Sequence, residues 1–142
     1  MHTMDEKGRV SIPAVLRAEL LEQDPRPPIL TNLVDCPAVG LFPQNRWTEI
    51  EQRLNNMSQM QPEVASLRRM LISGAVEAPI DGQGRILIPP YLREHGGLGR
   101  EVTIAGVGGR IEIWDRARFD QELQAIRRRG REVSTVAAEL GL

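Results

Sequence analysis

Apolar and polar residues alternate in two short segments of the chain, and each segment ends in proline. The segment RVSIP (9–13) places Val10 and Ile12 on one face, and RILIP (85–89) repeats the alternation. A period of two predicts a half-buried strand. The proline stops the strand and presets the backbone for a first helical turn. A short amphipathic helix is therefore expected over 14–21, and another after the second strand.

Both segments lie within a block of thirteen residues that the chain contains twice. DEKGRVSIPAVLR occupies 5–17 and DGQGRILIPPYLR occupies 81–93, and seven positions are identical: Asp, Gly, Arg, Ile, Pro, Leu and Arg. Asp at the first position and Gly at the fourth predict a type I turn with a bulge ahead of each strand. Gly8 and Gly84 stand where left-handed backbone is often needed, a conformation that glycine adopts without strain.

The segments that follow the two blocks also correspond. Hairpins are predicted over 27–43 and 100–115, the second with its turn at the glycine-rich GVGG (106–109). This GVGG is a hairpin turn and not a phosphate loop, because it lacks the Lys-Ser/Thr pair and the helix that such a loop needs. Near the end of each hairpin an aromatic residue is followed five positions later by a second, Trp47 or Phe119.

Helices are predicted by apolar spacing after both hairpins, over 47–57 and 119–129. Pro62 is expected to open a further helix that ends at Gly74, and a strand over 75–80 leads into the second block. Only four residues precede the first block, so its leading strand is expected either to be cut short or to be borrowed from elsewhere. The repeat is thus a whole module: strand, turn, strand, short helix, hairpin and helix.

The length fits one or two small units, the composition is that of a soluble globular protein, and the predicted elements are mainly β with short helices (α+β). Each half of the 142 residues holds little core alone, so the halves gain most by burying apolar faces against each other. The formal net charge of −1 gives no global attraction to nucleic acid, so any such role must rest on local clusters. Lys7 is the single lysine beside seventeen arginines.

No constellation of catalytic or metal-binding residues is found in the sequence, so we expect no enzyme, no cofactor, no metal and no small-molecule substrate. The residues weighed for such roles lack partners at recognisable spacing: Ser11, Ser134, His2, His95 and Cys36. A lone cysteine excludes an internal disulfide and fits a reducing cytosol. A polar amino terminus and the lack of a long apolar run indicate neither a signal peptide nor a membrane span.

The pattern Gly-Arg-apolar-x-Ile-Pro-x-x-Leu-Arg resembles the AbrB/SpoVT swapped-hairpin superfamily of bacterial regulators. Two copies, each with Asp four positions before the Arg, are similar to the MraZ family, as are LFP…W after the first block and IEIWD after the second. The resemblance implies two swapped-hairpin modules that pair within the chain as a pseudo-dimeric β-barrel with flanking helices. The expected divisions are 1–48 and 75–119 for the modules, 49–74 for connecting helices, and 120–142 for a C-terminal helix and tail.

The resemblance also implies a function. Members of the family are transcriptional regulators that form ring-shaped homo-oligomers, lie in the cytoplasm on the nucleoid, and bind short direct repeats in double-stranded promoter DNA. Their targets lie upstream of the division and cell-wall gene cluster, and their Asp-x-x-x-Arg turns face the DNA. The alternative is an antitoxin-like or scaffolding module of the same superfamily, whose chief partner is a protein.

Arg9 and Arg85 are the candidate base-reading residues, because a guanidinium can contact guanine in the major groove with two hydrogen bonds. The plainer interpretation pairs each Arg with the Asp of its own turn. The resemblance favours groove contact, with Asp5 and Asp81 in a supporting role beside the turn glycines. Lys7 is either a phosphate contact or a solvated turn residue.

Gln83 takes the place of Lys7 in the second turn, so the two turns are expected to contribute unequally to DNA binding. Arg17 and Arg93 are interpreted as structural: they pair with nearby residues such as Glu19 or Glu94, or they help to hold the two halves together.

The run RRRGR (127–131) is the densest positive patch in the sequence. It is interpreted as a solvated helix end, where the helix dipole favours positive charge, in preference to a DNA-binding tail or a contact with acidic residues of a neighbouring subunit. The segment 132–142 has apolar residues at helical spacing and is expected to pack on a neighbouring subunit.

Overall fold

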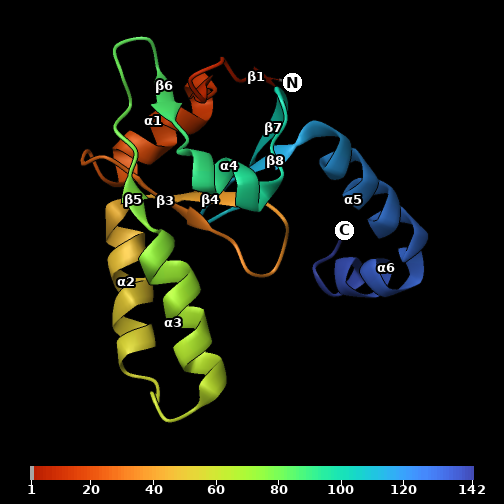
Figure 1. Ribbon diagram of the computed structural model, residues 1–142. Coiled ribbons are helices and arrows are strands. Elements are labelled where there is room, and N and C mark those ends of the chain that lie inside the picture. Colours follow the sequence, from red (N-terminus) through yellow and green to blue (C-terminus); the bar gives the residue numbers. More distant parts are fainter. Residues whose placement is uncertain (1) are drawn as a thin grey trace.

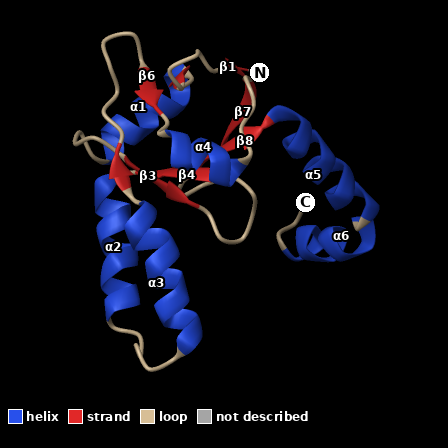
Figure 2. Cartoon of the chain, viewed as in Figure 1, coloured by secondary structure: helices blue, strands red, loops and turns tan. Residues whose placement is uncertain are grey.

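Pairs of consecutive strands alternate with one or two helices along the chain in the computed structural model, which describes residues 2–142 (Figures 1 and 2). The strands are β1 (His2–Thr3), β2 (Arg9–Ser11), β3 (Ile29–Asn32), β4 (Val39–Phe42), β5 (Val76–Glu77), β6 (Arg85–Leu87), β7 (Glu101–Gly106) and β8 (Ile111–Asp115). The helices are α1 (Ala14–Gln23), α2 (Gln44–Asn55), α3 (Pro62–Gly74), α4 (Pro90–Gly96), α5 (Arg116–Arg128) and α6 (Gly130–Glu139). The expected α+β class is confirmed.

The two repeats are intertwined by strand exchange. Six strands form an antiparallel sheet in the order β1-β7-β8-β4-β3-β5, and β2 pairs with β6 in a separate ribbon. Strand β1 of the first repeat pairs with β7 of the second, and β5 of the second repeat pairs with β3 of the first. Each repeat therefore completes the sheet of the other, as the resemblance implies.

The strand registers define a pseudo-twofold axis that relates the repeats. In the ribbon Val10 pairs with Ile86, its counterpart in the repeated block. In the sheet Gly40 pairs with Glu112. These two residues are also counterparts, because each lies two positions before the aromatic residue near the end of its hairpin, Phe42 or Trp114. Each equivalent residue lies opposite its own counterpart at these two points, so the axis passes through both pairs.

One apolar core lies between the ribbon and the inner face of the sheet. Its members are almost fully shielded from solvent and come from both repeats, among them Val10, Ile12, Ile86 and Ile88 of the ribbon segments and Leu30, Leu41, Val102 and Ile113 of the sheet. Burying such side chains contributes about 1.5–3 kcal/mol each. The ribbon, which carries the repeated blocks, is thus fixed to the sheet by its inward face.

A second core lies on the outer face of the sheet and contains the two aromatic pairs expected from the repeat. The rings of Phe42 and Trp47 lie 5.8 Å apart between centroids, and those of Trp114 and Phe119 lie 5.5 Å apart. Both pairs belong to one cluster that α3 helps to cover through Leu71 and Ile72. These matching pairs confirm that α2 and α5 are equivalent helices.

Most predicted elements are found, with changes at their ends. Helix α3 runs from Pro62 to Gly74 as predicted, whereas α2 begins at Gln44, directly after Pro43, and so earlier than the predicted 47. Strand β5 stops at Glu77 and is shorter than the predicted 75–80. In the β7–β8 hairpin, Gly106 still belongs to the strand, and only Gly108 of the three glycines has positive φ.

A buried carboxylate links α1 to α2. Asp24 follows α1 and is 6% exposed. Its Oδ2 accepts hydrogen bonds from the Arg26 side chain at 2.7 Å and from the Asn45 backbone N–H, in the first turn of α2, at 3.0 Å. The hydrogen bonds from the Arg26 side chain and backbone lower the pKa of Asp24 to about 2.

The helix pairs extend away from the sheet in two arms. Figure 1 shows α2 and α3 side by side at the bottom of the view and α5 with α6 at the right, while the loop from β5 into β6 projects at the top. None of the helices within residues 2–142 is both long and apolar enough to cross a membrane.

Candidate nucleic-acid interface

The first Asp-x-x-x-Arg turn is held together by its aspartate. Asp5 Oδ1 accepts hydrogen bonds from the backbone N–H groups of Lys7 at 3.0 Å and Arg9 at 2.8 Å, and its Oδ2 accepts one from Arg9 Nε at 2.7 Å. The backbone closes the turn through Gly8 N–H to the Asp5 carbonyl at 3.0 Å, with Gly8 at φ +89°. The hydrogen bond from the Arg9 backbone is the largest cause of the lowered pKa of Asp5.

The second turn has the same geometry. Asp81 Oδ1 accepts from the backbone of Gln83 at 2.8 Å and of Arg85 at 2.9 Å, and its Oδ2 accepts from Arg85 Nε at 3.0 Å. Gly84 has φ +78°, and the backbone hydrogen bond from Arg85 is likewise the main reason that the pKa of Asp81 is lowered. The turn with a positive-φ glycine, predicted from Asp and Gly spacing, is confirmed in both blocks.

The ribbon register places the two candidate arginines on one outward face. Arg9 lies opposite Leu87 and Arg85 lies opposite Ser11, while Val10 and Ile86 between them point into the core. Residues directly opposite each other in an antiparallel pair share a face, so Arg9 and Arg85 are diagonal neighbours on the same side. Their side chains are 36% and 27% exposed, and neither is in the packed interior.

Each guanidinium keeps its outer edge free for a ligand. Each one donates from Nε to the aspartate of its own turn, and within residues 2–142 the two Nη groups have no hydrogen-bond partner. The ion pair predicted by the plainer interpretation is thus present. It holds the arginine by its inner nitrogen, and the Nη groups remain able to donate to a base edge or to a phosphate.

The two turns lie at opposite ends of the ribbon, and each is bonded to the opposite repeat. The Gly8 carbonyl accepts from Ile88 N–H at 2.9 Å, and the Gly84 carbonyl accepts from Ile12 N–H at 3.0 Å. Lys7 and Gln83 are exposed at the tips of their turns. The arrangement forms one surface with a guanidinium toward each end.

The side chains of Arg17 and Arg93 each reach from their own repeat to the other one. The sequence leaves open whether they pair with nearby glutamates or hold the two halves together. A Cβ placed on Gly84 would meet the Arg17 guanidinium, and one placed on Gly8 would meet that of Arg93. Arg17 Nη1 also donates to the Ile12 carbonyl at 3.2 Å, and no ion pair with Glu19 or Glu94 is present in residues 2–142. Each arginine therefore packs on the turn of the other repeat.

The other candidates weighed from the sequence lie elsewhere. His95 Nε2 lies 3.2 Å from the Leu33 carbonyl, and Cys36 is half-buried with its pKa raised to about 11, mainly by burial. No group of three or more His, Cys, Asp or Glu in the described part of the chain is placed to hold a metal ion. The Arg127–Arg131 run spans the corner between α5 and α6, on the arm at the right of Figure 1.

A family model and three similar known proteins all indicate the same family. A family model described as "MraZ protein, putative antitoxin-like" matches residues 1–70 and again residues 71–138. The chain is 38% identical over 122 residues to "Transcriptional regulator MraZ" of Pseudoalteromonas translucida, covering 86% of this chain and 80% of that protein. Proteins of the same name from Solidesulfovibrio magneticus and Escherichia coli K12 are 39% and 37% identical, over 86% and 85% of this chain and 80% of each relative.

Proposed function

The chain belongs to the MraZ family of transcriptional regulators, and from that membership we propose that it binds promoter DNA sequence-specifically through its two Asp-x-x-x-Arg turns. The observation that carries the proposal is the pair of outward guanidiniums of Arg9 and Arg85, each held through Nε and open at both Nη groups. Two parallel N–H donors match the O6 and N7 acceptors of guanine in the major groove.

Asp5 and Asp81 orient the reading residues in this proposal. Each carboxylate fixes its turn by backbone hydrogen bonds and its arginine by Nε, so the side chain is ordered before DNA arrives. A preorganised donor loses less conformational entropy on binding. Lys7 contacts a phosphate, which adds affinity without sequence information, and Gln83 gives the second turn a weaker, uncharged contact at the same place.

Binding requires several subunits. One ribbon offers two arginines and a small surface, so we propose that a ring-shaped homo-oligomer engages spaced direct repeats at once and gains affinity by multivalency. In such an oligomer the ribbons bring Arg9, Arg85 and Lys7 of every subunit to one face, and this local positive charge allows a protein of net charge −1 to bind DNA. The proposed targets lie upstream of the division and cell-wall gene cluster, and the proposed location is the cytoplasm, on the nucleoid.

The test is a binding titration on DNA from upstream of the protein's own gene. Arg9→Ala and Arg85→Ala should each weaken binding by at least roughly 10- to 100-fold, because one base contact is lost in every engaged subunit, and should leave the oligomer mass unchanged. Arg69→Ala, an exposed arginine on α3 far from the ribbon, is the matched control and should bind normally. Unchanged binding by the ribbon variants would refute the role given to these arginines.

A second arm separates base reading from phosphate contact. Replacing operator guanines by 7-deazaguanine removes the N7 acceptor, so it should weaken wild-type binding and have little further effect on the double variant Arg9→Ala/Arg85→Ala. Lys7→Ala should lower the slope of log affinity against log salt by about one unit for each engaged subunit and keep the sequence preference. If the chain instead co-purifies with a stoichiometric small protein and shows no operator affinity, the antitoxin-like alternative is supported.

A further inference from the structure

The two repeats differ in how their last helices are placed. In the first repeat, α2 is followed by a six-residue connection, residues 56–61, that lets α3 fold back along α2 and bury Trp47 and Leu54. In the second repeat, only Arg129 separates α5 from α6, so α6 cannot fold back in the same way. No residue of α5 or α6 is buried. The second repeat therefore lacks the helix packing that completes the first.

Helix α6 carries an apolar stripe that is exposed within residues 2–142. Val133, Val136 and the C-cap residue Leu140 lie on one side at i, i+3 and i+7, and they are 42%, 56% and 72% exposed. Glu132 and Glu139 share one flank of this stripe, because residues seven apart fall on nearly the same side of a helix. Such a stripe is typical of a helix that packs against another surface.

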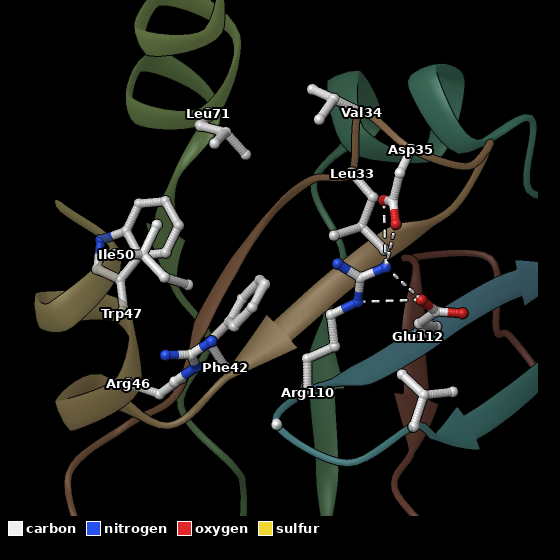
Figure 3. A pocket seen from close by; sticks show the side chains of 12 residues that line it. Leu33, Val34, Asp35, Phe42, Arg46, Trp47, Ile50, Leu71, Arg110 and Glu112 are labelled. Carbon is white, nitrogen blue, oxygen red and sulfur yellow. Dashed lines mark hydrogen bonds and ion pairs between the residues drawn. The ribbon is translucent and has the colours of Figure 1, made fainter. Parts of the chain in front are cut away.

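A groove beside α2 offers a surface of matching character. It has a volume of about 560 Å³ and lies between α2, the β3–β4 loop and the β7–β8 hairpin. Figure 3 shows Phe42, Trp47 and Ile50 on its α2 side, with Leu71 contributed from α3. At the other side Arg110 is neutralised by Asp35 and Glu112, at 2.9 and 2.6 Å. The groove is thus apolar along α2, and its opposite wall holds one positive and two negative side chains.

Positive charge lies on α2 beside this groove: Arg46 lines the groove, and Arg53 is exposed further along the same helix. Arg46 and Arg53 lie seven residues apart on α2, on the same side as Ile50. Seven residues correspond to about 10.5 Å along a helix, which is also the separation of Glu132 and Glu139 on α6. Arg46 is paired with Glu49 at 3.1 Å, but both side chains are largely exposed, 39% and 58%. Exposed ion pairs contribute little, so this one can be exchanged.

We propose that α6 of one copy of this chain lies in the α2 groove of a second copy, with its apolar stripe against Ile50 and Leu71 and Glu132 and Glu139 against Arg46 and Arg53. The contact resembles the pairing of apolar seams and flanking charges in coiled coils. Groove and helix lie on different parts of the molecule, so the contact is heterologous: each copy uses its helix on one neighbour and its groove on another.

This inference deepens the assembly part of the proposed function, on which it rests, and gives that assembly a defined interface. Heterologous contacts close into a ring or extend into a filament, depending on the rotation between copies. The ribbon with Arg9 and Arg85 takes no part in the contact. DNA reading and self-assembly are therefore separable by mutation.

The test is charge exchange across the interface, measured as mass by light scattering without DNA. Glu132→Arg/Glu139→Arg and Arg46→Glu/Arg53→Glu should each weaken self-association at least tenfold, because like charges then face each other. An equimolar mixture of the two variants should form a large assembly again, since every interface in an alternating assembly joins opposite charges. The chain with all four exchanges should assemble alone.

Control variants separate the proposed interface from effects on folding and on DNA binding. Arg69→Glu/Arg100→Glu makes the same net charge change as Arg46→Glu/Arg53→Glu, at exposed positions outside the interface, and should keep the wild-type mass. Melting curves of all variants check that the fold is intact. A monomeric wild type, an unchanged mass for either interface variant, or a failure of the mixture to recover would overturn the proposal. Arg9→Ala, which tests DNA reading, should keep its mass, so the two proposals fail by different results.

Discussion

The two turn glycines should respond differently to alanine although their turns have the same geometry. Both Gly8 and Gly84 have positive φ, which costs about 1–2 kcal/mol for any residue with a Cβ. At Gly84 a Cβ would lie 1.9 Å from Arg17 Nη1, the far end of a flexible side chain that can move aside. At Gly8 a Cβ would lie 2.7 Å from the Ile88 carbonyl oxygen, which is backbone and cannot move freely.

The magnitudes follow from these contacts. Gly84→Ala should cost about 1–2 kcal/mol for the backbone conformation. Gly8→Ala should cost about 2–3 kcal/mol, because moving the Ile88 backbone also disturbs its 2.9 Å hydrogen bond to the Gly8 carbonyl, worth about 1 kcal/mol. At about 3–4 °C per kcal/mol for a chain of this length, the melting temperature should fall by about 3–8 °C and about 6–12 °C.

The assay is thermal unfolding at one fixed protein concentration, since self-association makes the melting temperature depend on concentration. Gly82→Ala is the matched control: it lies in the same turn as Gly84, has no positive φ, and its Cβ would meet nothing within 4 Å. It should leave stability unchanged or slightly raised. The reasoning fails if Gly82→Ala is as harmful as Gly84→Ala, or if Gly8→Ala is no worse than Gly84→Ala.

Other predictions test the core, a helix junction and the cysteine. Ile86→Ala, 1% exposed at the centre of the ribbon, should cost about 2–5 kcal/mol in urea unfolding, whereas Leu87→Ala, 53% exposed beside it, should cost less than about 0.5 kcal/mol. The pKa of Asp24 is about 2 in the folded protein and about 3.9 in the unfolded chain. Ionised Asp24 therefore stabilises the fold above about pH 3.9, and this stabilisation is lost as the pH falls toward about 2. The melting temperatures of wild type and Asp24→Asn should accordingly differ at about pH 6 and converge near pH 2. The raised pKa of Cys36, about 11, should make its thiol react with a disulfide reagent at pH 8 at least about tenfold more slowly than free cysteine; equal rates would contradict the burial assigned to it.

The sequence predicts well those turns and helices whose conformation is determined by a few neighbouring residues. The Asp5 turn closes on itself within five residues, so Asp and Gly at the right spacing are sufficient to predict it. Helix α3 is equally local, because Pro62 favours its start and its apolar spacing continues to Gly74. The turns of the candidate site and the helices of this kind therefore follow from the sequence alone.

Long-range pairing could not be predicted from local pattern alone. The exchange of β1 and β5 between repeats joins residues about 45 to 100 positions apart, and alternation along a strand does not say which strand lies beside it. The crossing of Arg17 and Arg93 has the same origin. A signal for it does exist: the final Arg of each thirteen-residue block is identical although neither the turn nor the strand requires it.

The pairing of Gly40 with Glu112 shows what fusion of two modules into one chain permits. Two identical subunits must place the same residue on both sides of their symmetry axis: two glutamates would set like charges face to face, and two glycines would leave no acceptor there. Here Glu112 alone receives Arg110 Nη2 at 2.6 Å and Trp114 Nε1 at 3.0 Å, with a glycine opposite. In a single chain with two repeats, the two residues that face each other across the pseudo-twofold axis can differ. The repeats can therefore carry different residues, glycine and glutamate, at the one place where two identical subunits must carry the same one.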